Sequence, residues 1–193
     1  MKIAIIGTGA IGGLVAGYLK LKGQEVSLVG RTDSIKAIKE KGLQISGVRG
    51  NFDIRIDAFE KLNYKPNLAI LSTKTQDIEA SIEENLKVIQ DTAVLTTQNG
   101  IQADYIVSKY IPKKNIVSSI IMFGSTNLEP GKVVHNFEGN WIIGKIFTKN
   151  DEILNTIHDI LQEIFPTIIT EQIRGMKYLK IFINANNCIP AIL

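Results

Sequence analysis

The chain has 193 residues, of which 45% are hydrophobic and 21% are charged, and its formal net charge is +3. This composition is typical of a folded globular protein and excludes a disordered tail, and the charge is too small to indicate nucleic-acid binding. One cysteine excludes an internal disulfide framework, and no apolar run approaches the roughly 20 residues of a membrane-spanning helix, so we expect a cytoplasmic protein that binds neither nucleic acid nor membrane.

Short β-rich apolar runs alternate with amphipathic stretches along most of the chain. The apolar runs predict strands over 2–7, 25–30, 67–73, 93–100, 115–124 and 167–170, and the stretches with helical spacing predict helices over 11–22, 34–41, 76–89, 104–110 and 151–164. Period-two alternation predicts a β-hairpin insertion from 43–47 and 52–56, and antiparallel additions over 132–137 and 140–145. This alternation of strands and helices predicts an α/β fold with a doubly wound parallel sheet.

A glycine-rich turn joins the first strand to the first helix. In the sequence GTGAIG, residues Gly7, Gly9 and Gly12 stand at G-x-G-x-x-G spacing. The first glycine makes a tight turn, the second lets a pyrophosphate approach the backbone, and the third lets the helix pack closely on the strand. The positive end of the helix attracts the phosphates. We therefore predict a Rossmann-type dinucleotide site; a purely structural turn is the alternative.

The second strand ends at Gly30, followed by Arg31, where an acidic residue would hold the ribose of NAD. Glycine removes the repulsion of a 2′-phosphate and leaves space for it, and the arginine guanidinium suits bidentate phosphate contact. The hydroxyls of Thr32 and Ser34 add hydrogen-bond donors. We therefore expect NADP as the cofactor. The alternative is that Arg31 is a surface residue near the start of a helix.

Two further polar residues follow predicted strands at the edge of the sheet where ligands bind. Lys74 comes directly after 67–73 and can reach a cofactor phosphate. Asn99 comes near the end of 93–100, and its amide can contact the nicotinamide ribose and the substrate together. Each residue taken singly is equally well an ordinary loop residue, but together with the glycine turn they predict one crevice.

From Ile173 the sequence predicts a largely apolar helix with no strand after it, and the helical run stops at Leu193 among apolar residues, without a polar tail. An apolar helix needs a partner that buries its face. We therefore expect a nucleotide-binding domain over 1–172, and over 173–193 the first helix of a truncated, all-helical substrate domain. A terminal helix that folds back on the sheet is the alternative. The apolar helix also favours self-association as a homodimer.

Lys180, Asn184 and Asn187 share one face of this terminal helix. Polar side chains on an otherwise apolar helix need partners if they are buried, and a cleft that holds a polar substrate would provide them. The alternative is that this stripe faces water.

The motifs GTGAIGG, STKTQD, TTQNG and KIFIN, with the arginine after the second strand and in this order, resemble the ketopantoate reductase (2-dehydropantoate 2-reductase) family. The stretch PGKVVHNFEGNWIIGK resembles the family's segment between the fifth strand and the long helix. The resemblance covers nearly the whole chain. It implies the NADPH-dependent reduction of 2-dehydropantoate to pantoate, a step toward pantothenate and coenzyme A, with a small 2-keto acid as the substrate.

The resemblance also implies a role for each matching residue. Gly7, Thr8, Gly9, Ala10, Ile11 and Gly12 would cradle the pyrophosphate, Arg31 and Lys74 would face the 2′-phosphate, Asn99 would contact cofactor and substrate, Lys180 would donate the proton, and Asn184 would bind substrate. The ammonium of Lys180 would stabilise the charge that develops on the substrate oxygen, and desolvation would lower its pKa.

One position on the terminal helix departs from the family pattern. Cys188 stands where the family commonly has a second asparagine, and we expect Asn187 to bind the substrate in its place. This departure leaves a reductase of another 2-keto acid or of an opine-type substrate as an alternative. A non-catalytic NADP(H)-binding module is a third reading. His135 and His158 are interpreted as structural or exposed, and the sequence predicts no metal site.

Overall fold

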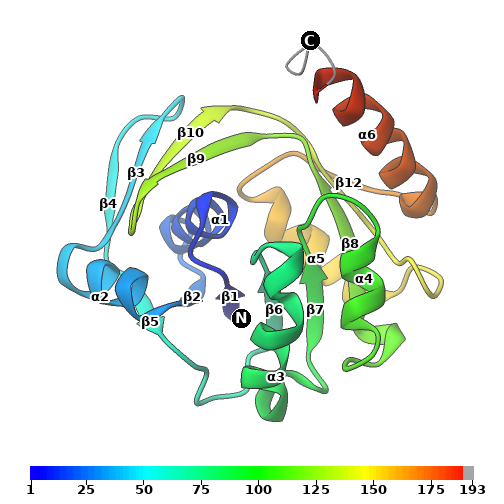
Figure 1. The fold of residues 1–193 in the computed structure, drawn as a ribbon, viewed down its shortest axis with the longest axis horizontal. Coiled ribbons are helices and arrows are strands. Elements are labelled where there is room, and N and C mark those ends of the chain that lie inside the picture. The colour runs from blue at the N-terminus through cyan, green and yellow to red at the C-terminus, as the bar shows by residue number, and fades with distance from the viewer. Residues whose placement is uncertain (189–193) are drawn as a thin grey trace.

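The computed structural model describes the backbone of residues 1–188 and the side chains of residues 1–185 (Figure 1). Within these residues, eight strands form the main sheet in the order β12-β11-β8-β7-β6-β1-β2-β5. Their bounds are β1 Lys2–Ile6, β2 Glu25–Val29, β5 Asp57–Phe59, β6 Leu68–Leu71, β7 Ala93–Thr96, β8 Ile116–Ile121, β11 Trp141–Gly144 and β12 Thr167–Ile169. Every neighbouring pair is parallel except β8 with β11, which confirms a parallel sheet with an antiparallel addition.

Helices cover both faces of this sheet, which confirms the doubly wound, Rossmann-type arrangement. The helices and single helical turns are α1 Ala10–Leu21, α2 Thr32–Lys41, η1 Thr75–Asp77, α3 Ile78–Ile89, α4 Gln102–Val107, η2 Lys113–Asn115, α5 Glu152–Gln162 and α6 Ile173–Cys188. Alternate residues of β1 point to opposite faces. Ile5 packs in one core with α1, α2 and α5, whereas Ile6 packs in the other with α3 and α4.

A second sheet of four strands within the described residues has the order β4-β3-β10-β9, and Figure 1 shows β9 and β10 arching over α1. Its strands are β3 Leu43–Gly47, β4 Phe52–Ile54, β9 Gly124–Glu129 and β10 Lys132–Phe137. The predicted hairpin is present as β3 and β4, which pair antiparallel. The addition predicted at 132–137 is in this second sheet, where β10 runs parallel to β3 and antiparallel to β9.

Two strands of the structure were not predicted. Most residues of β9 are exposed, so they carry no apolar face that alternation could indicate. Only three residues form β5, and its pairing with β2 depends on a partner some thirty residues away. His135 of β10 is structural, as interpreted: it is fully buried, with Nδ1 2.9 Å from the Tyr18 hydroxyl of α1.

Among the residues whose side chains are described, α6 is most deeply buried in its first part. Ile173 lies in a small cluster with Ile120 of β8 and Ile142 of β11, and Lys177 is buried. The next two turns carry exposed large apolar side chains, which are Tyr178, Leu179, Ile181, Phe182 and Ile183. The helix therefore begins by folding back on the sheet and then leaves an apolar face exposed. Among residues 1–188, no helix is long and apolar enough to span a membrane.

Candidate functional site

Five neighbouring parallel strands, β2, β1, β6, β7 and β8, end at the same edge of the main sheet, and polar loops follow them. Three cavities of the described part of the chain lie along this edge. The β2–α3 cavity has about 570 Å³ and is lined by residues after β2 and along α3. The turn cavity, about 320 Å³, is lined by the glycine turn and the loop after β6. The α6 cavity, about 440 Å³, lies between the ends of β7 and β8 and α6.

The glycine turn fits a phosphate group. A β-carbon on Gly12 would lie 1.9 Å from the Gly7 carbonyl oxygen, so only glycine lets α1 pack this closely, whereas a β-carbon on Gly9 would have nothing within 4 Å. The first turn of α1, which begins at Ala10, holds no acidic residue, and Gly9 gives no side-chain cap. The positive end of α1 is therefore open to an anion.

The structure distributes the residues expected at the pyrophosphate between two cavities. Gly7, Thr8 and Gly9 line the turn cavity, and Ile11 lines the α6 cavity. Ala10 and Gly12 line neither of these cavities, and their contribution is to the backbone of the turn. Lys74 is exposed at the start of η1 and lines the turn cavity together with Arg31.

Gly30 lines both the β2–α3 cavity and the turn cavity, so there is free space beside it, although the side chain of Thr8 fills the direction in which a β-carbon would point. A β-carbon on Gly30 would lie 2.6 Å from Thr8 Cγ2. A side chain at position 30 would therefore displace the side chain of Thr8, because the glycine turn lies close to the end of β2. Arg31 does line both the β2–α3 cavity and the turn cavity, and its side chain is 85% exposed.

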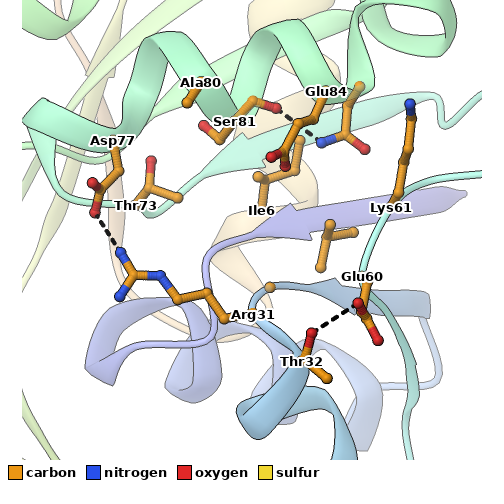
Figure 2. Close-up of a pocket in the computed structure, with 13 residues that line it drawn as sticks. Ile6, Arg31, Thr32, Glu60, Lys61, Thr73, Asp77, Ala80, Ser81 and Glu84 are labelled. Carbon is orange, nitrogen blue, oxygen red and sulfur yellow. Dashed lines mark hydrogen bonds and ion pairs between the residues drawn. The ribbon is translucent and has the colours of Figure 1, made fainter.

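Figure 2 shows the guanidinium of Arg31 reaching across the rim of the β2–α3 cavity toward Asp77, with an Nη2 to Oδ2 distance of 3.4 Å. At the other side of the cavity, the Thr32 hydroxyl donates a hydrogen bond of 2.8 Å to Glu60. Thr73 Oγ1 is buried and has no hydrogen-bond partner among residues 1–188, although Thr73 lines both cavities. An unpartnered buried hydroxyl favours a polar ligand at this place.

Gln98 fixes the loop that carries Asn99. Its Nε2 donates to the carbonyl oxygens of Leu71, at 3.0 Å, and Thr73, at 2.9 Å, and so ties the loop after β7 to the loop after β6. Asn99 itself is exposed and lines the α6 cavity. Gln98 was not predicted as a site residue, although its place beside Asn99 at the end of a predicted strand was a signal.

Lys180 and Asn184 both line the α6 cavity, and both are partly buried, so their stripe faces the cavity rather than open water. The Lys180 ammonium donates to the carbonyl oxygen of Ile121 at the end of β8. Burial, and next the positive charge of Lys177, lower the pKa of the Lys180 ammonium. Asn187 lies in α6, but its side chain is outside the described residues, as is that of Cys188.

A buried ion pair beneath this cavity was missed by the sequence analysis. Lys177 Nζ lies 2.7 Å from Asp104 Oδ2, and both side chains are almost fully buried. The hydroxyls of Thr96 and Ser118 also donate to the Asp104 carboxylate, at 2.6 and 2.8 Å. No local signal marks this pair, because its partners stand 73 positions apart in the sequence.

The family model described as ketopantoate reductase PanE/ApbA matches residues 3–147. The 2-dehydropantoate 2-reductase of Pyrococcus horikoshii is 34% identical to the chain, in a match that covers 100% of this chain and 64% of that protein. The chain thus spans about three fifths of the length of this relative.

Two solved structures are also similar. D-mandelate dehydrogenase with NADH and anilino(oxo)acetate is 27% identical and has a TM-score of 0.84, over 93% of this chain and 60% of that chain. The 2-dehydropantoate 2-reductase from Methylococcus capsulatus is 26% identical and has a TM-score of 0.80, over the same shares. The family match over most of the sequence, on a fold of this kind, means that the chain belongs to the ketopantoate reductase family.

Proposed function

We propose that the protein is an NADPH-dependent 2-dehydropantoate 2-reductase, or the part of one that holds the cofactor and the proton donor. The observation that carries this proposal is the row of cavities along one sheet edge. Arg31 and Lys74 lie at its phosphate end, and Lys180 lies at its other end. Cations placed in this way suit an anionic cofactor and a reaction that develops negative charge on oxygen.

The described residues fit a dinucleotide. The β2–α3 cavity has apolar walls from Ile6, Val29 and Ala80, which suit a flat base. The open backbone at Gly9 and the start of α1 would hold the pyrophosphate, and Arg31 with Lys74 would hold a 2′-phosphate. When bound, NADPH supplies the hydride for reduction of the C2 ketone.

Residues of the chain itself would donate the proton and orient the substrate. Lys180, held by the Ile121 carbonyl, would stabilise the charge on the ketone oxygen and donate a proton to it from Nζ. Its lowered pKa makes this ammonium a better acid near neutral pH. Asn99 and Asn184, which line the same cavity, would orient the polar groups of the substrate.

Replacement of Lys180 by alanine tests this proposal. In the complete gene product, Lys180→Ala is expected to lower kcat for 2-dehydropantoate by about 10²–10⁴-fold. The Kd for NADPH is expected to stay within about twofold, because Lys180 acts on the substrate side. Lys149→Ala, which removes an exposed lysine outside these cavities, is the control. Wild-type turnover in Lys180→Ala would contradict the assignment.

A second candidate is a reductase of another 2-keto acid. The similar D-mandelate dehydrogenase is described with NADH and anilino(oxo)acetate, and much of the α6 cavity is apolar, including Ile120, Phe123 and Met176. Comparison of kcat/KM for 2-dehydropantoate with that for aromatic 2-keto acids and opine precursors separates the two. A higher value for an aromatic keto acid would favour the second candidate, and NADPH binding with no turnover of any substrate would favour a non-catalytic module.

The domain boundary, the oligomeric state and the location of the protein also remain proposals. We place the domain boundary between 172 and 173, where the chain leaves β12 and enters α6, and limited proteolysis there would test it. Self-association as a homodimer is open to mass measurement by light scattering. A cytoplasmic location, and a pathway leading to coenzyme A, follow from the proposed activity.

A further inference from the structure

A carboxylate occupies a place where the proposed cofactor brings negative charge. Asp77, the last residue of η1, lines both the β2–α3 cavity and the turn cavity, as Arg31 does. Its Oδ2 lies 3.4 Å from Arg31 Nη2, and its side chain is 36% exposed. Figure 2 shows the guanidinium of Arg31 directed toward Asp77 at the rim of the cavity. The residue proposed to meet the 2′-phosphate therefore already has an anionic partner.

The strength of the ion pair between Arg31 and Asp77 determines whether a phosphate group can replace Asp77 at the guanidinium. An ion pair between exposed side chains is weak, so a phosphate dianion can displace the carboxylate from the guanidinium. The displaced carboxylate stays at the same rim, where its charge repels the phosphate. Lys74 faces the turn cavity and offsets part of this repulsion, whereas Glu60 is bonded to Thr32 on the far side of the β2–α3 cavity.

We propose that Asp77 is a specificity-determining residue, which competes with the 2′-phosphate for Arg31 and narrows the preference of the protein for NADPH over NADH. This inference depends on the proposed function, because it assumes that Arg31 meets the 2′-phosphate. The wild-type protein is therefore expected to bind both cofactors. Its ratio of the Kd for NADH to the Kd for NADPH is expected to be smaller than in a protein whose Arg31 has no carboxylate partner.

Two nucleotides that differ only in the 2′-phosphate test the inference without any need for turnover. Calorimetry measures the Kd of adenosine 2′,5′-bisphosphate and of adenosine 5′-monophosphate at one fixed salt concentration. In Asp77→Asn, binding of the bisphosphate is expected to tighten about fivefold, which corresponds to ~1 kcal/mol, and binding of the monophosphate is expected to change less than about twofold. The side chain of Asp77 makes no capping hydrogen bond to α3, so this substitution leaves the helix start intact.

Asp33→Asn is the matched control, because it removes the same charge two positions from Arg31 at a residue that lines neither cavity. If Asp77→Asn and wild type discriminate equally between the two nucleotides, or if Asp33→Asn gives the same gain, the inference on Asp77 is overturned. The Arg31→Ala variant distinguishes an error about Asp77 from an error about the proposed binding of the 2′-phosphate by Arg31. Loss of discrimination in Arg31→Ala supports the phosphate role of Arg31 whatever Asp77 does, whereas equal binding of both nucleotides by wild type and Arg31→Ala contradicts that role.

Discussion

Gly9 and Gly12 belong to one motif but meet different physical demands. A β-carbon on Gly9 would enter open space at the start of α1, and the backbone there has φ −75°, which alanine adopts without strain. Gly9→Ala is therefore expected to leave the melting temperature nearly unchanged. It should weaken NADPH binding by about tenfold or more, or ~1.4 kcal/mol, because the added methyl group occupies the phosphate approach. Thermal unfolding and calorimetry on the same sample measure both effects.

Gly12→Ala should behave in the opposite way. Its β-carbon would lie 1.9 Å from the Gly7 carbonyl oxygen, which is backbone and cannot rotate aside. The expected loss of unfolding free energy is about 1–3 kcal/mol or more, as for other overpacked sites. Urea denaturation gives this value. A Gly12→Ala variant as stable as wild type, or a Gly9→Ala variant that binds NADPH normally, would show that the turn does not work as described.

The proposed role of Lys180 as proton donor predicts how kcat changes with pH. The proton donor must be charged, so kcat falls as the pH rises through its pKa. Because burial and Lys177 lower that pKa, the fall should occur below about 10.4, the ordinary value for lysine. Lys180→Arg carries a group that stays protonated, so any residual activity should lack this fall. A pH profile of kcat checks both; the same profile in wild type and Lys180→Arg would refute the assignment.

At the scale of elements, the ion pair of Asp104 and Lys177 fastens α6 to α4 beneath the α6 cavity. Asp104→Ala leaves a buried ammonium without its partner, so the free energy of unfolding should fall by about 3–5 kcal/mol. The control is Glu25→Gln, which breaks the exposed pair of Glu25 with Lys2 and should change stability little. Denaturation in urea compares the two variants. Equal, small losses would mean that the buried pair contributes no more than a surface pair.

The buried His135, at the contact of β10 with α1, predicts that the free energy of unfolding falls in acid. Burial lowers the pKa of His135, although Glu138 partly opposes this and Arg49 adds to it. The unfolded chain therefore binds more protons than the folded chain as the pH falls through about 6.5, so the free energy of unfolding decreases. His135→Gln keeps a polar group near Tyr18 but removes this titration. Between pH 7.5 and 5.5, urea denaturation should show a smaller loss in His135→Gln than in wild type, and equal losses would exclude His135 as the cause.

At the scale of the whole molecule, the sequence predicted the parts of the fold that local patterns encode. Buried strands such as β1 and β6 are continuous apolar runs, and their helices follow at regular spacing, so the parallel sheet could be predicted. The second sheet could not be predicted in full, because β3 and β10 pair across nearly ninety residues. These two strands both pack against α1, so their pairing depends on the tertiary structure, and no local sequence pattern indicates it.

The candidate site also has a part that could be predicted from the sequence and a part that could not. Residues at or just beyond the ends of predicted strands, such as Arg31, Lys74 and Asn99, could be placed at one edge from the alternation of elements alone. Thr8 beside Gly30, Asp77 on Arg31, and Lys177 on Asp104 are contacts between side chains from different elements. Their geometry depends on packing distances of a few ångströms, which a sequence pattern does not contain.

The central claim is that the carboxyl edge of the main sheet holds an NADP(H) molecule with its 2′-phosphate at Arg31. A crystal structure of the chain with bound NADPH tests this most directly. We expect the pyrophosphate against Gly9 and the start of α1, the adenine in the β2–α3 cavity, and the Arg31 guanidinium moved from Asp77 onto the 2′-phosphate. A nucleotide bound elsewhere, or one bound here while Arg31 still contacts Asp77 and no phosphate, would contradict the account.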